Sequence, residues 1–137
     1  MDANPLVYAT TENPRRERCL ELLAAVAAGR LKARTAVNVI EELLHLELRG
    51  RPPGLHGAAE RFSQLFTPLL DVTDDIIGEA LTIDAPKLGS NDRVIVATGR
   101  AAGISTILTG DAGFDSVPGI QRVDPLDADA VAALLAP

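Results

Sequence analysis

Residues 104–109, with the sequence ISTILT, carry the clearest strand signal in the chain, and Gly110 and Asp111 follow them directly. The segment is short, apolar and rich in β-branched residues, which is typical of a strand buried on both faces of a parallel sheet. Ligands of such sheets bind beyond the carboxyl ends of the strands. Asp111 therefore stands where chemistry is expected.

Helical patterns and short apolar runs alternate on both sides of this strand. Apolar spacing predicts helices at residues 15–29, 39–50, 55–69, 74–85 and 90–103 and from 126 onward. Thr73 and Ser90 are expected to cap two of them, and Gly29, Gly50 and Gly103 to end three. Further strands are expected at 31–37, 69–72 and 120–123. Strands separated by helices predict an α/β fold with a parallel sheet covered on both faces.

Composition narrows the class of protein. A chain of 137 residues with 47% hydrophobic residues suits a single domain over 1–137. The single cysteine, Cys19, excludes a disulfide framework, and two histidines, His45 and His56, are too few for a multi-histidine metal centre. We expect a cytoplasmic protein without a membrane span, because the longest apolar run, 22–28, falls far short of the roughly 20 residues needed.

The net charge of −6 argues against binding of nucleic acid by bulk electrostatics alone, because domains that bind in this way are usually basic. Any such role requires a local site, a metal ion or a partner. Seven arginines are candidates for phosphate contacts, although most of them are by default expected to be scattered over the solvated surface. They are Arg15, Arg16, Arg18, Arg30, Arg34, Arg49 and Arg51.

Acidic residues recur where the expected helices begin or strands end. They are Asp2, Glu41, Glu42, Asp92, Asp111 and Asp115. In a parallel α/β fold such junctions can converge on one edge of the sheet. Two carboxylates 4 Å apart repel by about 4 kcal/mol at an effective dielectric constant of 20. A cluster of them therefore favours a hard divalent cation, which takes oxygen ligands.

A structural interpretation competes with the functional one for each of these residues. An acidic side chain in the first turn of a helix stabilises the helix dipole and often does nothing else, which applies to Asp92 and Glu42. Asp115 is equally suited to a turn. Cys19 lies on an apolar helical stripe and is expected in the core, while His45 is expected to be a packing or surface residue.

Four segments, in order along the chain, resemble the motifs of the PIN-domain family, and specifically its single-domain VapC-type toxins. Residues 2–8 (DANPLVY) resemble the opening motif, and residues 39–45 (VIEELLH) resemble the second. Residues 90–95 (SNDRVI) resemble the third. The closing segment, 108–115 (LTGDAGFD), followed by PGI at 118–120 and VDP at 123–125, is the most specific match.

The resemblance implies a three-layer α/β/α fold with a short parallel sheet and an acidic pocket. Its catalytic residues would be Asp2, Glu42, Asp92 and Asp111. Its metal ligands would be Asp2, Asp92, Asp111 and Asp115, with Asn4 and Thr109 orienting the carboxylates through hydrogen bonds. A helical wheel does not decide between Glu41 and Glu42; we select Glu42 because it adjoins the apolar pair Leu43 and Leu44.

The implied activity is cleavage of single-stranded or looped RNA by an endoribonuclease that depends on one or two Mg²⁺ or Mn²⁺ ions. The implied biological role is that of a toxin restrained by a cognate antitoxin protein. The resemblance also implies a homodimer, for which the helix carrying Phe62 and Phe66 is a candidate contact, with core packing as the alternative. Family members carry an apolar strand before the first aspartate, whereas only Met1 precedes Asp2 here, so this strand is very short or lies partly outside the sequence.

Two other functions remain open on the sequence. The first is a catalytically weak binding module of the same fold, whose acidic pocket docks a basic partner. The second is a phosphoaspartate receiver or dehalogenase-type phosphatase, which requires a lysine near the phosphoryl site. Neither Lys32 nor Lys87 follows an expected strand, and Asn4 stands where the phosphatase signature requires an aspartate, so this last class is disfavoured.

Overall fold

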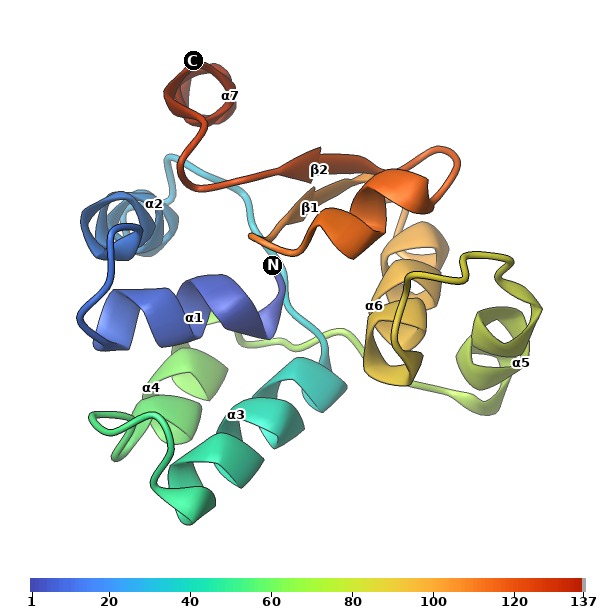
Figure 1. Cartoon of the computed structure of the whole chain (residues 1–137), viewed down its shortest axis with the longest axis horizontal. Coiled ribbons are helices and arrows are strands. Elements are labelled where there is room, and N and C mark those ends of the chain that lie inside the picture. Colours follow the sequence, from blue (N-terminus) through green and yellow to red (C-terminus); the bar gives the residue numbers. More distant parts are fainter. Residues whose placement is uncertain (137) are drawn as a thin grey trace.

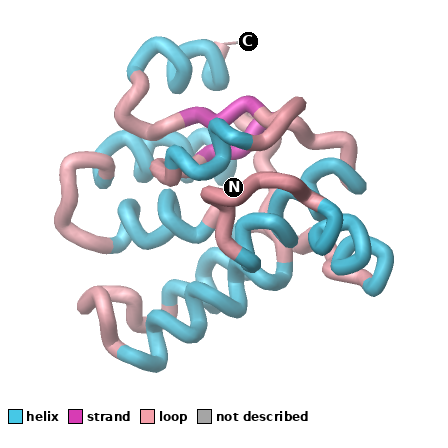
Figure 2. Tube along the Cα trace, turned by 45° about the vertical axis from the view of Figure 1, so that its right-hand side comes forward, coloured by secondary structure: helices cyan, strands magenta, loops and turns pink. Residues whose placement is uncertain are grey.

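The computed structural model describes residues 1–136 and is mainly helical around a short sheet (Figures 1 and 2). Its α-helices are α1 (Ala3–Thr10), α2 (Arg16–Ala27), α3 (Val37–Arg49), α4 (Ala58–Leu65), α5 (Asp74–Thr82), α6 (Ser90–Ala101) and α7 (Ala128–Leu135). Its strands are β1 (Thr106–Leu108) and β2 (Gln121–Val123), with the 3₁₀ helix η1 (Ala112–Ser116) between them.

The two strands pair in parallel, with Thr106 opposite Gln121 and Leu108 opposite Val123. They lie within two of the expected strands, and the intervening segment returns the chain to the same edge, as a parallel pair requires. A short parallel sheet among helices agrees with the α/β class expected from the sequence. The connection between the strands contains η1, which the sequence pattern did not indicate.

The strands expected at 31–37 and 69–72 are corrected by the structure. These segments meet only at one isolated parallel bridge between Ala36 and Leu70. The amide of Val37 donates to the carbonyl of Leu70, and the amide of Leu70 donates to Thr35. Because α3 begins at Val37, the chain leaves the extended conformation before a longer ladder can form.

The start of the chain lies between this segment and β1, near the N label in Figure 1. The amino group of Met1 donates to the Arg34 carbonyl at 2.7 Å, and the Thr35 hydroxyl donates to the Met1 carbonyl at 2.8 Å. The amide of Asp2 donates to the Leu108 carbonyl at 3.2 Å. Met1 and Asp2 therefore join the two flanking segments across the place that a central strand would take.

Several helix ends follow the sequence signals, but the helix expected at 55–69 is reduced to α4, Ala58–Leu65, which follows Gly57 in the left-handed conformation. The Thr73 side chain accepts a hydrogen bond from Ile76 at the start of α5, and Gly50 ends α3 in the left-handed conformation, with φ of 64°. Gly89, rather than the expected Ser90, is the N-cap residue of α6. Ser90 instead takes the first helical position, where its side chain makes no capping bond.

The core contains side chains from most elements. Leu6, Val39, Leu43 and Phe114 are completely buried. Cys19 is buried, as expected from its position on the apolar stripe of α2. Phe62 and Phe66 are also buried in this core, so they are not available as the dimer contact considered from the sequence. None of the helices in residues 1–136 has the length and apolar character needed to cross a membrane.

Arg93 fastens the loop that precedes α6. Its guanidinium donates to the carbonyls of Leu88 at 3.2 Å and Ala85 at 3.0 Å, and also to that of Ile83. The same loop touches η1, because a Cβ placed on Gly113 would lie 3.0 Å from the carbonyl oxygen of Lys87. Arg93 therefore sets the position of the first turn of α6 relative to η1.

Replacing Arg93 with lysine is expected to destabilise the protein by about 2 kcal/mol. A single ammonium group cannot reach three carbonyls, and hydrogen bonds to charged groups contribute about 1.5–3 kcal/mol each. Urea unfolding monitored by circular dichroism measures the loss. Arg100→Lys is the matched control on the same helix, since the Arg100 guanidinium makes one hydrogen bond, to the Pro118 carbonyl, and one ion pair, with partly exposed Glu79, among residues 1–136. Equal losses in the two variants would contradict the clamp.

Candidate active site

Asp2 is the most buried carboxylate of the candidate site, with 3% of its surface exposed. One oxygen accepts a hydrogen bond from the Ala3 amide at 2.6 Å, which caps α1. The other accepts bonds from the Asn4 amide group at 3.2 Å and the Thr109 hydroxyl at 2.6 Å. The side chains expected to orient the carboxylates are thus both bonded to Asp2.

Thr109 connects Asp2 to Asp111. Besides donating to Asp2, its completely buried hydroxyl accepts a hydrogen bond from the Asp111 amide at 3.1 Å. The Asp111 carboxylate in turn accepts from the Gly113 amide at 2.7 Å and begins η1. One hydroxyl at the end of β1 therefore fixes the relation between the first acidic residue of the chain and the acidic residue after the strand.

Asp92 lies in the first turn of α6, close enough to Asp2 and Asp111 to respond to their charges. Burial, followed by the negative charges of Asp2 and Asp111, raises the pKa of Asp92 from 3.8 to about 6. Burial also raises the pKa of Asp2, and the charge of Asp111 adds to this increase against the hydrogen bonds from Thr109 and Ala3. The charge of Asp111 therefore disfavours the charged forms of both Asp2 and Asp92.

Glu42 joins the same group from α3. Burial is the main cause that raises its pKa, and the charges of Asp2 and Asp92 act in the same direction. The Asn91 amide group donates to the Glu42 carboxylate at 2.5 Å and opposes the shift. Glu41 points into solvent and makes no comparable contact within residues 1–136. The structure thus separates two neighbours that the helical wheel left equivalent.

Asn91 and Asn38 belong to the site and were not singled out from the sequence. The Asn38 amide group donates to the Asn91 carbonyl oxygen at 2.7 Å, while Asn91 donates to Glu42. Because a carboxylate only accepts hydrogen bonds, Glu42 fixes the orientation of the Asn91 amide. The side-chain oxygen of Asn38 is buried without a partner among residues 1–136. The adjacent Asp92 was the one available sequence signal, since Asn91 precedes it in the SND motif.

Asp115 lies in a different environment. Its carboxylate pairs with the Arg122 guanidinium at 2.9 Å, and its side chain is 56% exposed. Arg122 also donates to Asp124 at 3.2 Å. The charges that shift the pKa values of Asp2, Glu42 and Asp92 do not include that of Asp115. Asp115 is thus paired with an arginine and is not among the charges that act on the acidic group.

The acidic group fits a hard divalent cation in its chemistry. It offers oxygen ligands only, and partial burial together with mutual repulsion disfavours the charged forms of Asp2, Glu42 and Asp92, a cost that a cation would offset. Within residues 1–136, no three His, Cys, Asp or Glu side chains already stand at metal-binding spacing. An ion held by one or two of these carboxylates would complete its coordination with water molecules, as Mg²⁺ usually does.

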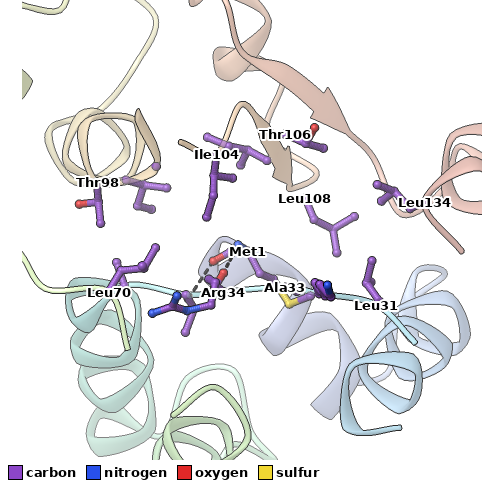
Figure 3. Close-up of a pocket in the computed structure, with 16 residues that line it drawn as sticks. Met1, Leu31, Ala33, Arg34, Leu70, Thr98, Ile104, Thr106, Leu108 and Leu134 are labelled. Atoms are coloured by element: carbon purple, nitrogen blue, oxygen red, sulfur yellow. Dashed lines mark hydrogen bonds between the residues drawn. The ribbon is translucent and has the colours of Figure 1, made fainter. Parts of the chain in front are cut away.

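Met1 is also among the residues that line a cavity of about 150 Å³ (Figure 3). Ile104 and Leu108 line it from β1 and its approach, and Leu70 and Ala33 from the opposite segment. The acidic residues are not among those that line it. This cavity is an apolar gap between the segments flanking Met1 and is separate from the acidic site.

Comparison with known proteins assigns the fold to a family. The model of the PIN domain family matches residues 1–120. The chain belongs to this family, as its motifs indicated. It is also 31% identical over 141 residues to ribonuclease VapC7 of Mycobacterium tuberculosis (strain ATCC 25618 / H37Rv), an alignment that covers 98% of this chain and 96% of that protein. The chain is therefore a PIN-domain protein of the VapC type. No solved structure matches it significantly.

Metal-free protein is expected to become less stable as the pH rises through about 6. The folded state raises the pKa of Asp92 above its ordinary value of 3.8, so folding is favoured when this group is protonated and is opposed once it ionises. Asp2 and Glu42 shift in the same direction. Asp92→Asn should therefore raise the urea midpoint in chelator near neutral pH and reduce the pH dependence.

Urea titrations at pH values from below 3.8 to above 6 measure the change in midpoint. Exposed Asp84→Asn is the control, which should leave the pH profile unchanged. A wild-type midpoint that increases steadily with pH through this range would contradict the electrostatic description of the site.

Proposed function

We propose that this chain is a divalent-metal-dependent endoribonuclease, the toxin of a toxin–antitoxin pair. The observation that carries the proposal is that the Thr109 hydroxyl joins Asp2 to Asp111, and that Asp92 lies close enough for the charges of both to raise its pKa. Asp2 precedes α1, Asp92 lies in α6 and Asp111 follows β1. Bringing three acidic side chains together does not stabilise the fold, because like charges repel. The similarity to a protein named a ribonuclease supports the reaction class.

Asp2, Asp92 and Asp111 would hold one or two Mg²⁺ or Mn²⁺ ions, because their oxygen atoms suit hard cations. When bound, such an ion offsets charge on phosphate oxygens and makes water a better nucleophile near neutral pH. Asp115 is the fourth proposed ligand, and it would have to exchange its bond to Arg122 for the ion.

The remaining polar residues act on these carboxylates. Asn4 and Thr109 hold Asp2 in place through hydrogen bonds, which fixes its orientation before an ion binds. Glu42, with a pKa raised by burial, is suited to accept a proton from the attacking water. Asn91 keeps the Glu42 carboxylate directed toward the site, and Asn38 in turn holds Asn91.

The proposed partners are an RNA substrate, a cognate antitoxin and a second copy of the chain. An acidic pocket with raised pKa values also offers a site for an arginine of the antitoxin, because a guanidinium pairs with carboxylates in a fork. Such an arginine would compete with the metal ion for the same oxygens, which provides a direct means of inhibition.

Asp92→Asn and Asp111→Asn are each expected to lower the rate of metal-dependent cleavage by a factor of about 10² or more, since each removes a proposed charged ligand. Cleavage of a panel of structured RNAs in Mg²⁺ or Mn²⁺ is measured by gel electrophoresis. Asp84→Asn is the control. Asp115→Asn should cost less, because its carboxylate is already paired with Arg122.

Full activity in Asp92→Asn would remove the catalytic assignment. A wild-type protein that cleaves no RNA and shows no increase in melting temperature with millimolar Mn²⁺ would instead be a binding module of the PIN fold, because a bound ion stabilises the folded state by mass action.

Glu42→Gln and Glu41→Gln form a matched pair that tests which neighbour belongs to the site. Glu42→Gln should lower kcat by about 10² or more, the scale of general acid–base catalysis. Glu41→Gln should leave kcat within about twofold, because surface substitutions away from a site have small effects. The opposite ranking in single-turnover cleavage assays would transfer the role to Glu41.

A further inference from the structure

Arg15, at the start of α2, extends toward the edge of the acidic site. Its guanidinium lies over the Tyr8 ring, 5.1 Å from the ring centre, and its Nε donates to Asp124 at 3.3 Å. A Cβ placed on Gly110 would lie 3.3 Å from the Arg15 Nε and 2.9 Å from the Tyr8 hydroxyl. Gly110 lies between Thr109 and Asp111 in the sequence. Arg15 therefore lies beside the segment that carries these two site residues.

Arg15 keeps hydrogen-bonding capacity that its surroundings do not use. Within residues 1–136 its two terminal nitrogens make no hydrogen bond, while its Nε is engaged by Asp124. Its side chain is only 27% exposed, because Tyr8 and Asp124 restrict it. Arg15 is therefore a positioned cation with a free fork of N–H donors, the geometry that suits a phosphate.

The neighbouring arginines differ in this respect. Arg122 uses its Nε for Asp115 and a terminal nitrogen for Asp124. Arg16 and Arg18, on the same helix as Arg15, pair with Glu12 and Glu21 on the exposed surface. Arg93 is occupied by three backbone carbonyls.

RNA must approach this site against unfavourable charge. The chain carries a net charge of −6, and four acidic side chains gather at the proposed reaction centre. A cation at the edge of that centre attracts the backbone without occupying the metal ligands. We propose that Arg15 binds a phosphate of the RNA strand at the edge of the acidic pocket, held in position by the ring of Tyr8 and the carboxylate of Asp124.

This inference rests on the proposed ribonuclease function for its substrate, and it defines a contact that the catalytic residues do not supply. Tyr8 and Asp124 are positioning residues. The Tyr8 ring attracts the guanidinium through its π-electron face, and Asp124 engages the Nε edge, which leaves the two terminal nitrogens without a hydrogen bond among residues 1–136.

The test is binding of a short fluorescein-labelled single-stranded RNA, measured by anisotropy over a series of salt concentrations. The full chain carries Asp92→Asn to prevent cleavage, and Mg²⁺ is present. Adding Arg15→Gln should raise Kd about tenfold, the size of one charge-assisted contact. The plot of log K against log salt should become less steep by about 0.7, the value for one lost contact with a single strand.

Arg18→Gln is the matched control, since it removes the same charge from the same helix at an exposed ion pair, and it should change neither quantity. Arg15→Lys keeps the charge without the fork, so the salt slope should return to the starting value while Kd remains raised. In the active protein, Arg15→Gln should raise KM more than it lowers kcat. A purely structural role for Arg15 would alter the melting temperature without changing the salt slope.

An Arg15→Gln protein whose salt slope equals that of Arg18→Gln overturns the inference. If Arg15→Gln does not fold, Arg15→Lys against Arg18→Lys decides, and equal Kd values overturn it. Wild-type cleavage together with an unchanged slope overturns the phosphate contact alone. A reduced slope without wild-type cleavage overturns the nuclease and supports the contact. Absence of both cleavage and RNA binding overturns both proposals.

Discussion

The hydrogen bond of 2.6 Å between the Thr109 hydroxyl and the Asp2 carboxylate is the contact on which the arrangement of the site depends. It joins Asp2, at the start of the chain, to Thr109, which directly follows β1. The same hydroxyl accepts the amide of Asp111, so a single buried side chain sets two acidic residues relative to each other. Burial makes the bond stringent, because an unpaired carboxylate or hydroxyl there would cost free energy.

The acidic site opposes folding electrostatically. Asp2, Glu42 and Asp92 all have raised pKa values, with burial as the largest cause and the charges of neighbouring carboxylates acting in the same direction. The fold tolerates this because the surrounding core and the Arg93 clamp hold the contributing elements in place. A divalent cation bound there, as proposed, would offset this cost, so the same repulsion that lowers stability would contribute to the affinity for the ion.

The local sequence pattern predicted most of the helices and the strand β1. Apolar spacing, Thr73 and Gly50 define helices through neighbours a few residues away, and the positions agree with the structure. The expected strand at 31–37 did not form, because strand pairing depends on a distant partner and Met1 and Asp2 supply only two residues of it. The Asn91 contact with Glu42 joins residues 49 positions apart, so no local pattern predicts it.

The sequence by itself determined the family, the short parallel sheet and the set of acidic residues that follow helix starts and strand ends. Only the tertiary structure decided that Glu42 rather than Glu41 faces Asp2, that Asp115 pairs with Arg122, and that Arg15 reaches Gly110. The physical reason is range. Helix periodicity and turn chemistry act over a few residues, whereas the direction of a side chain toward a shared site is set by how separate elements pack.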